Sequence, residues 1–97
     1  MKYIVQTEIS PEVGIEIEAH PEILQEWIGK WQALNPVGVY FGLTRRVTTI
    51  IVDVPDQDAM FEVLHNTWVL TNSYPDVWPV ADAAEFPAIL QRAGVAP

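Results

Sequence analysis

The sequence predicts one α+β domain, in which helices cover one face of an antiparallel sheet. The chain has 97 residues, which is enough for a single compact domain, and no repeat or linker divides it. Stretches of alternating or β-branched apolar residues, typical of strands, occur near the start, in the middle and near the end. Two stretches between them carry apolar residues at helical spacing. We therefore treat residues 1–97 as one domain.

The first strand is expected over residues 2–9, KYIVQTEI. Its side chains alternate, so Tyr3 and Val5 face one way while Ile4 and Gln6 face the other. The next segment, 10–21, is ambiguous. It begins with Ser-Pro-Glu, which favours a helix start, but it contains a glycine and ends in His-Pro, which disfavours helix. We expect a short helical turn or an irregular lead-in there.

A clear helix is predicted for residues 21–34, because Trp27, Trp31 and Leu34 fall on one stripe and Asn-Pro follows. Residues 38–54 are rich in β-branched and aromatic side chains. They divide at Thr-Arg-Arg, 44–46, which we interpret as the tip of a hairpin between two strands.

A second clear helix is predicted for about residues 57–70, with Phe61, Leu64 and Trp68 on its apolar face and His65 on or beside that face. Residues 76–81 then form a last strand, which its proline places at a sheet edge or a bulge. The tail, 85–97, is short and amphipathic, and we expect it to dock on a partner subunit.

The predicted order of elements is strand, helix, two strands, helix, strand. This βαββαβ order is that of the ferredoxin-like fold, a four-stranded antiparallel sheet with two helices on one face. The other face of the sheet then lies bare, and a second copy of the chain is its usual cover. In addition, 49% of the residues are apolar and four are tryptophans, which is rich for a small domain, and this surplus suggests a subunit interface, a ligand pocket or both.

Charge and composition also exclude some functions. The net charge of −8, with 13 acidic against five basic residues, disfavours nucleic acid and anionic membrane surfaces as partners. The absence of cysteine excludes disulfides and thiolate metal sites, and fits the cytoplasm. We see no signal peptide and no apolar run of membrane-spanning length.

Three stretches carry a family resemblance that extends over nearly the whole chain: MKYIVQTEI, IIVDVPDQD and YPDVWPVADAAEF. They resemble the dimeric α/β-barrel superfamily, and within it muconolactone isomerase-like small proteins. The resemblance implies that two protomers join sheet to sheet, each with a pocket between its sheet and helices. Members include isomerases that need no cofactor, monooxygenases, haem-degrading enzymes and proteins without known catalysis. The ligand-binding residues implied for this chain are Tyr3, Trp27, Trp31, Phe41 and Trp68.

Three residues are candidates for catalysis. His65 is suited to proton transfer near neutral pH, although a boundary histidine bonded to water or backbone is the simpler interpretation. Tyr40 could steady a developing oxyanion, or it could be a core or interface residue. Arg45, next to Arg46, could hold a carboxylate with two parallel hydrogen bonds, or it could be part of a solvated turn.

No metal site is predicted, because Glu62 and His65 form only one ligand pair of the kind that di-metal sites need twice. Two functions stay open: a cofactor-independent isomerase or monooxygenase acting on an aromatic or lactone-like metabolite, or a non-catalytic homodimeric module that binds a ligand or a protein. A haem-binding protein is a lesser alternative. The sequence leaves open whether the protein is an enzyme at all.

Overall fold

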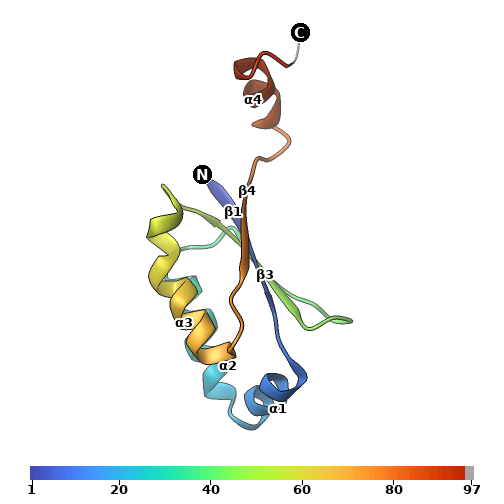
Figure 1. Cartoon of the computed structure of the whole chain (residues 1–97), viewed down its shortest axis with the longest axis vertical. Helices are drawn as coiled ribbons and strands as arrows, with labels where there is room; N and C mark the ends of the chain where they lie inside the picture. Colours follow the sequence, from blue (N-terminus) through green and yellow to red (C-terminus); the bar gives the residue numbers. More distant parts are fainter. Residues whose placement is uncertain (96–97) are drawn as a thin grey trace.

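A computed structural model describes residues 1–95 of the chain, and its core is a four-stranded antiparallel sheet with helices packed on one face (Figure 1). This confirms the predicted α+β class. The elements in chain order are β1 (Lys2–Glu8), α1 (Pro11–Ala19), α2 (Pro21–Gln32), β2 (Gly38–Phe41), β3 (Val47–Asp53), a 3-10 turn η1 (Gln57–Met60), α3 (Phe61–Thr71), β4 (Asp76–Val80) and α4 (Phe86–Arg92).

The strands lie in the order β2-β3-β1-β4, and every neighbouring pair is antiparallel. This arrangement is compatible with a ferredoxin-like fold. In the register, Ile4 of β1 lies between Ile51 of β3 and Trp78 of β4, and these three side chains share the sheet face away from the helices. In Figure 1 the sheet is seen edge-on, with α2 and α3 on one side and no helix of residues 1–95 on the other.

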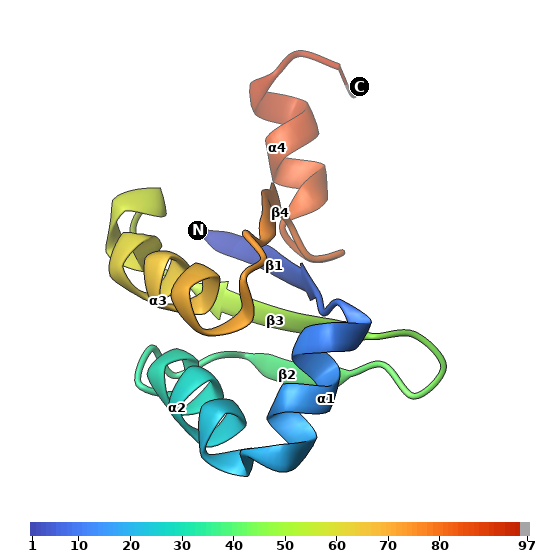
Figure 2. The same cartoon turned by 60° about the horizontal axis from the view of Figure 1, so that its bottom comes forward.

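The ambiguous segment at residues 10–21 contains a complete helix, α1, where we expected a turn or an irregular lead-in. The Ser10 hydroxyl accepts a hydrogen bond from the Val13 N–H at 3.3 Å, and Pro11 occupies the first turn. The backbone of His20 is not helical, with φ −131° and ψ 76°, so α1 ends there and α2 begins at once (Figure 2). The helix-start signal therefore outweighed the glycine within it.

The helix α3 turns a different face to the sheet from the one we predicted. Its buried residues are Val63, Leu64, Thr67 and Thr71, whereas Phe61 and Trp68 are exposed. The buried threonines are satisfied within the fold, since Thr67 donates to the Val63 carbonyl and Thr71 to the Thr67 carbonyl. The helix can therefore bury threonine in place of the aromatic side chains.

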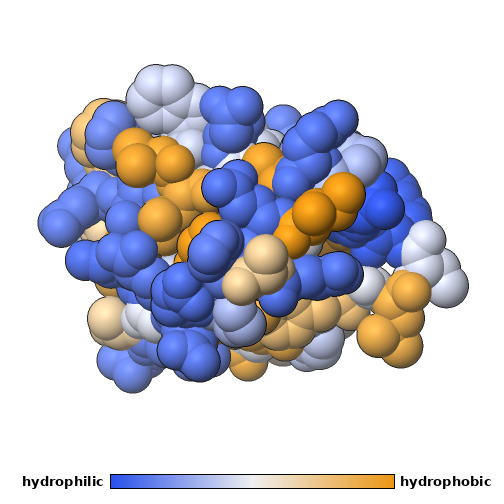
Figure 3. Space-filling view, turned by 90° about the horizontal axis from the view of Figure 1, so that it is seen from below, coloured by the Kyte–Doolittle hydropathy of each residue, from blue (hydrophilic) through white to orange (hydrophobic). Residues whose placement is uncertain are grey.

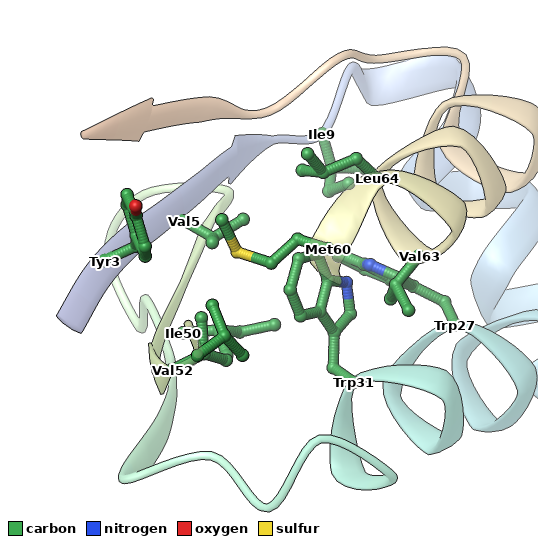
Figure 4. Packing of buried hydrophobic residues seen from close by; sticks show 11 residues of the cluster. Tyr3, Val5, Ile9, Trp27, Trp31, Ile50, Val52, Met60, Val63 and Leu64 are labelled. Atoms are coloured by element: carbon green, nitrogen blue, oxygen red, sulfur yellow. The ribbon is translucent and has the colours of Figure 1, made fainter. Parts of the chain in front are cut away.

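The core between the sheet and the helices is filled with side chains (Figure 4). Val5 and Ile50 point from the sheet towards Trp31 and Met60, and all of these are at most 1% exposed. Tryptophans and a methionine thus occupy the space where we expected a pocket.

The last helix, α4, extends beyond the end of the sheet instead of packing on it (Figure 1). The radius of gyration is 15.6 Å, whereas a compact domain of about 100 residues has roughly 13 Å. Residues 85–95 of the expected tail, 85–97, therefore form a projecting arm, and the last two residues lie outside the described part of the chain.

Candidate functional site

The residues that we predicted to line a pocket fall in three different places. Tyr3 and Trp31 are buried in the filled core, where the Trp31 indole N–H donates to the Thr67 hydroxyl at 2.9 Å. Trp68 is 46% exposed on the outer side of α3. Trp27 and Phe41 remain, and they meet at a cleft near the end of the sheet that carries the β2–β3 hairpin.

The candidate catalytic residues are also separated. His65 is exposed on α3, and its ring lies between Phe61, with centroids 6.4 Å apart, and Trp68, with centroids 5.6 Å apart. Tyr40 pairs with Thr49 on the open face of the sheet and is 61% exposed. Arg45 is at the hairpin tip. The structure therefore does not bring these three side chains to one point.

The cleft itself has a volume of about 240 Å³ and lies where α1, the start of α2 and the β2–β3 hairpin converge. Its apolar wall comes from both helices and the hairpin, and includes Ile17, Leu24, Trp27 and Phe41. Trp27 is 1% exposed, and its indole N–H has no hydrogen-bond partner among the described residues. Figure 3 shows this end of the molecule, where apolar patches lie between hydrophilic side chains.

Both arginines of the hairpin tip line this cleft. The Arg46 side chain runs against α1: its Nε is 3.8 Å from the place where a Cβ on Gly14 would be. Within residues 1–95 neither guanidinium takes part in a salt bridge. The one carboxylate among the lining residues is Glu18, so the side chains of the cleft carry an excess of positive charge in an acidic protein.

The backbone around the arginines is fixed by two hydrogen bonds. The Gly42 N–H donates to the Val47 carbonyl at 2.8 Å, which closes the hairpin, and the Ile9 N–H donates to the Arg46 carbonyl at 2.8 Å. Any side chain at position 42 would clash, because its Cβ would lie 2.4 Å from the Arg45 carbonyl oxygen. Glycine is therefore required for this turn.

A wider surface hollow of about 970 Å³ adjoins the cleft and shares Ile9, Gly42 and both arginines with it. Its other polar residues include Glu8, Ser10 and Ser73. His65 lines neither the hollow nor the cleft. We considered Arg45 and Arg46 together from the sequence, but the role of α1 in this site was missed, because we did not expect a complete helix there.

Two residues with shifted pKa values, Lys2 and Asp82, lie at the base of the α4 arm. The Lys2 ammonium donates to Glu85 Oε1 at 2.7 Å and to Asp82 Oδ2 at 3.2 Å, and these bonds, that to Glu85 first, raise the pKa of Lys2 above its ordinary value of 10.5. The Glu85 backbone N–H donates to Asp82 Oδ1 at 2.8 Å and, with Lys2, lowers the pKa of Asp82 below its ordinary value of 3.8. These groups hold the arm at the end of β1 and have no part in the cleft.

Comparison with known proteins finds no family model and no curated protein that match this chain. Among the described residues, no three His, Asp or Glu side chains gather closely enough to hold a metal ion. None of the helices in residues 1–95 has both the length and the apolar character needed to cross a bilayer.

Proposed function

We propose that this chain is the protomer of a homodimeric ligand-binding protein of the dimeric α/β-barrel type. The observation that carries the proposal is the open face of the sheet, which carries no helix of residues 1–95 and is crossed by an apolar row of Ile4, Ile51 and Trp78. A second copy, joined sheet to sheet, supplies the cover that such a face needs.

The open face has the composition of a protein interface. Ile4 and Ile51 lie side by side and are half-buried, and Trp78, 39% exposed, pairs with Ile4. The next row is polar at Gln6 and Thr49 and ends in Tyr40, which is 61% exposed. Aromatic residues are enriched in interfaces of this kind, and charged residues are depleted at their centres. The charged members of this face, which include Asp53, lie at the ends of the strands.

The elongated shape supports the same proposal. The α4 arm leaves Phe86 and Ile89 exposed, and they line an apolar hollow of about 370 Å³ together with Val80. Val80 pairs with Lys2 on the open face, so the hollow adjoins the edge of that face. A partner protomer on the sheet would contact both surfaces.

Binding is favoured over catalysis by the contents of the cleft. Proton transfer needs a titratable group within reach of the bound molecule. The cleft offers two arginines, which stay charged, and a single carboxylate, Glu18; its lining holds no second titratable group to complete an acid–base pair, and His65 and Tyr40 lie elsewhere. The isomerase and monooxygenase activities, and the haem site at His65, therefore receive no support from the arrangement of these residues.

The proposal is tested by measuring the molar mass of the protein by light scattering after size exclusion. We expect a dimer that buries roughly 1,200 Å² or more. Ile51→Glu places a charge at the centre of the interface and should weaken dimerisation by at least about 100-fold, yielding monomer. Ile15→Glu makes the same change on the exposed side of α1, where Ile15 is 69% exposed, and should stay dimeric. A monomeric wild-type protein at micromolar concentration would overturn the proposal.

A further inference from the structure

We propose that the cleft between α1, α2 and the β2–β3 hairpin binds a small monocarboxylate with an apolar body, and that Arg45 and Arg46 hold its carboxylate. The inference deepens the proposed function: it rests on the protein being a binder and names the site and the ligand class.

The charge of the ligand follows from the two guanidiniums. They are two of only five basic residues in a chain with 13 acidic ones, and both line the same cleft. Neither is neutralised by a salt bridge within residues 1–95. Arginine presents a planar fork of donors that matches a carboxylate with two parallel hydrogen bonds.

The apolar body follows from the rest of the lining. Ile17, Leu24, Trp27 and Phe41 line the same cleft as the arginines. The volume of about 240 Å³ is slightly below the roughly 300–1,000 Å³ of pockets for drug-sized ligands, so the ligand is a small molecule with one ring or a short chain. A bare inorganic anion would leave this apolar wall in contact with water.

The charges of the side chains that line the cleft favour a ligand with a single negative charge. Glu18 lines it together with the cationic residues and offsets part of their charge. A dianion would gain from the arginines but would be repelled by Glu18 and by the overall charge of −8. A monoanion meets these constraints best.

The position of Arg46 is partly fixed before any ligand binds. Its carbonyl accepts the Ile9 N–H at 2.8 Å, and its side chain passes close to α1 at Gly14, with Nε 3.8 Å from the place that a Cβ on this glycine would occupy. This is a van der Waals distance, so the Arg46 side chain lies against α1 beside the cleft. Such preorganisation reduces the entropy that binding must overcome.

The test is a titration of the full chain with phenylacetate, followed by amide chemical shifts in NMR spectra. Phenylacetamide, which has the same shape without the charge, is the matched ligand control. We expect phenylacetate to shift the amides of residues 9–18 and 41–48, and to bind at least about fivefold more tightly than phenylacetamide. Equal binding of the two compounds, binding of inorganic phosphate as tight as that of phenylacetate, or no shifts in these two ranges would overturn the inference.

Substitutions of the two arginines test whether they hold the carboxylate of the ligand. Arg45→Ala and Arg46→Ala should each weaken phenylacetate binding by about five- to tenfold, and the double variant should abolish the preference over phenylacetamide. Arg46→Lys keeps the charge but loses the fork, and should fall between wild type and Arg46→Ala. Arg92→Ala removes the same charge from α4, outside the cleft, and should bind as wild type does. Wild-type affinity in the double variant would refute the assignment.

The molar mass of each sample separates this inference from the proposed dimer. A dimer that does not bind phenylacetate overturns the ligand class alone. A monomer that binds it with the expected arginine dependence overturns the dimer alone.

Discussion

The buried hydrogen bond between Trp31 and Thr67 gives a quantitative test of how the core is held together. The indole N–H donates to the Thr67 hydroxyl at 2.9 Å, and both residues are completely buried. Thr67→Val keeps the shape of the side chain but removes the acceptor, so the Trp31 N–H is left unpaired in the core. An unsatisfied buried donor costs about 1–3 kcal/mol. A loss of about 2 kcal/mol would lower the melting temperature of a domain this size by roughly 8–16 °C.

The size of the loss depends on the tryptophan, which makes the prediction specific. In a Trp31→Phe background there is no indole N–H that could lose its acceptor, so Thr67→Val should change the free energy of unfolding by less than about 0.5 kcal/mol. Thr71→Val is the matched control on the same helix. Its hydroxyl donates only to the Thr67 and Ser73 carbonyls, so removing it leaves no buried donor without an acceptor. Thr71→Val should therefore lower the free energy of unfolding by less than about 1 kcal/mol.

The measurement is urea unfolding followed by far-UV circular dichroism, at one fixed protein concentration because dimerisation would contribute to stability. The slope with urea should be the same for all variants, which shows that the same amount of surface is exposed on unfolding. Equal losses from Thr67→Val in the wild-type and Trp31→Phe backgrounds would refute the reasoning, since the cost would then not come from the indole.

Two further predictions concern exposed parts of the chain. Gly29 lies within α2 with open space where its Cβ would be, so Gly29→Ala should raise the free energy of unfolding by about 0.5–1 kcal/mol; an unchanged urea midpoint would contradict this. Because the folded state lowers the pKa of Asp82, its ion pair with Lys2 stabilises the attachment of the α4 arm fully above pH 3.8. This stabilisation is lost as the pH falls through the still lower pKa of the folded state. The raised pKa of Lys2 means that its contribution is complete below pH 10.5 and is lost as the pH rises above that value. Hydrogen exchange of the α4 amides should therefore become faster, relative to that of the α3 amides, when the pH is lowered below 3.8. In Lys2→Met the α4 amides should exchange faster than in the wild type already at neutral pH, again relative to the α3 amides. Equal relative exchange in Lys2→Met and wild type at neutral pH would contradict this.

The strands and the two long helices could be predicted from the sequence because their patterns are local. Alternation in KYIVQTEI is enough to give β1, and the stripe through Trp27 and Trp31 is enough to give α2. The segment before α2 could not be assigned in this way, since favourable and unfavourable signals were mixed. The Ser10 cap decided it in favour of a helix.

The candidate site was predicted less well because it depends on packing. The spacing of Phe61, Leu64 and Trp68 indicated an inward face, but Thr67 and Thr71 satisfy their own hydroxyls and occupy that face instead. Nothing in a local pattern says which of two amphipathic stripes meets the sheet. The arginine pair could be found from the sequence as a turn, but its cleft depends on contacts between α1, α2 and the hairpin.

The four tryptophans show how the aromatic residues of this chain are divided. Trp27 and Trp31 are buried in the core and, with Met60, occupy the space where a pocket was expected. Trp78 is on the open face of the sheet, whereas Trp68 is on the outer side of α3, which packs against the opposite face. A sheet-to-sheet dimer would therefore cover Trp78 and leave Trp68 exposed beside His65. The two tryptophans outside the core thus lie on two different surfaces, and pairing through the sheet accounts for only one of them.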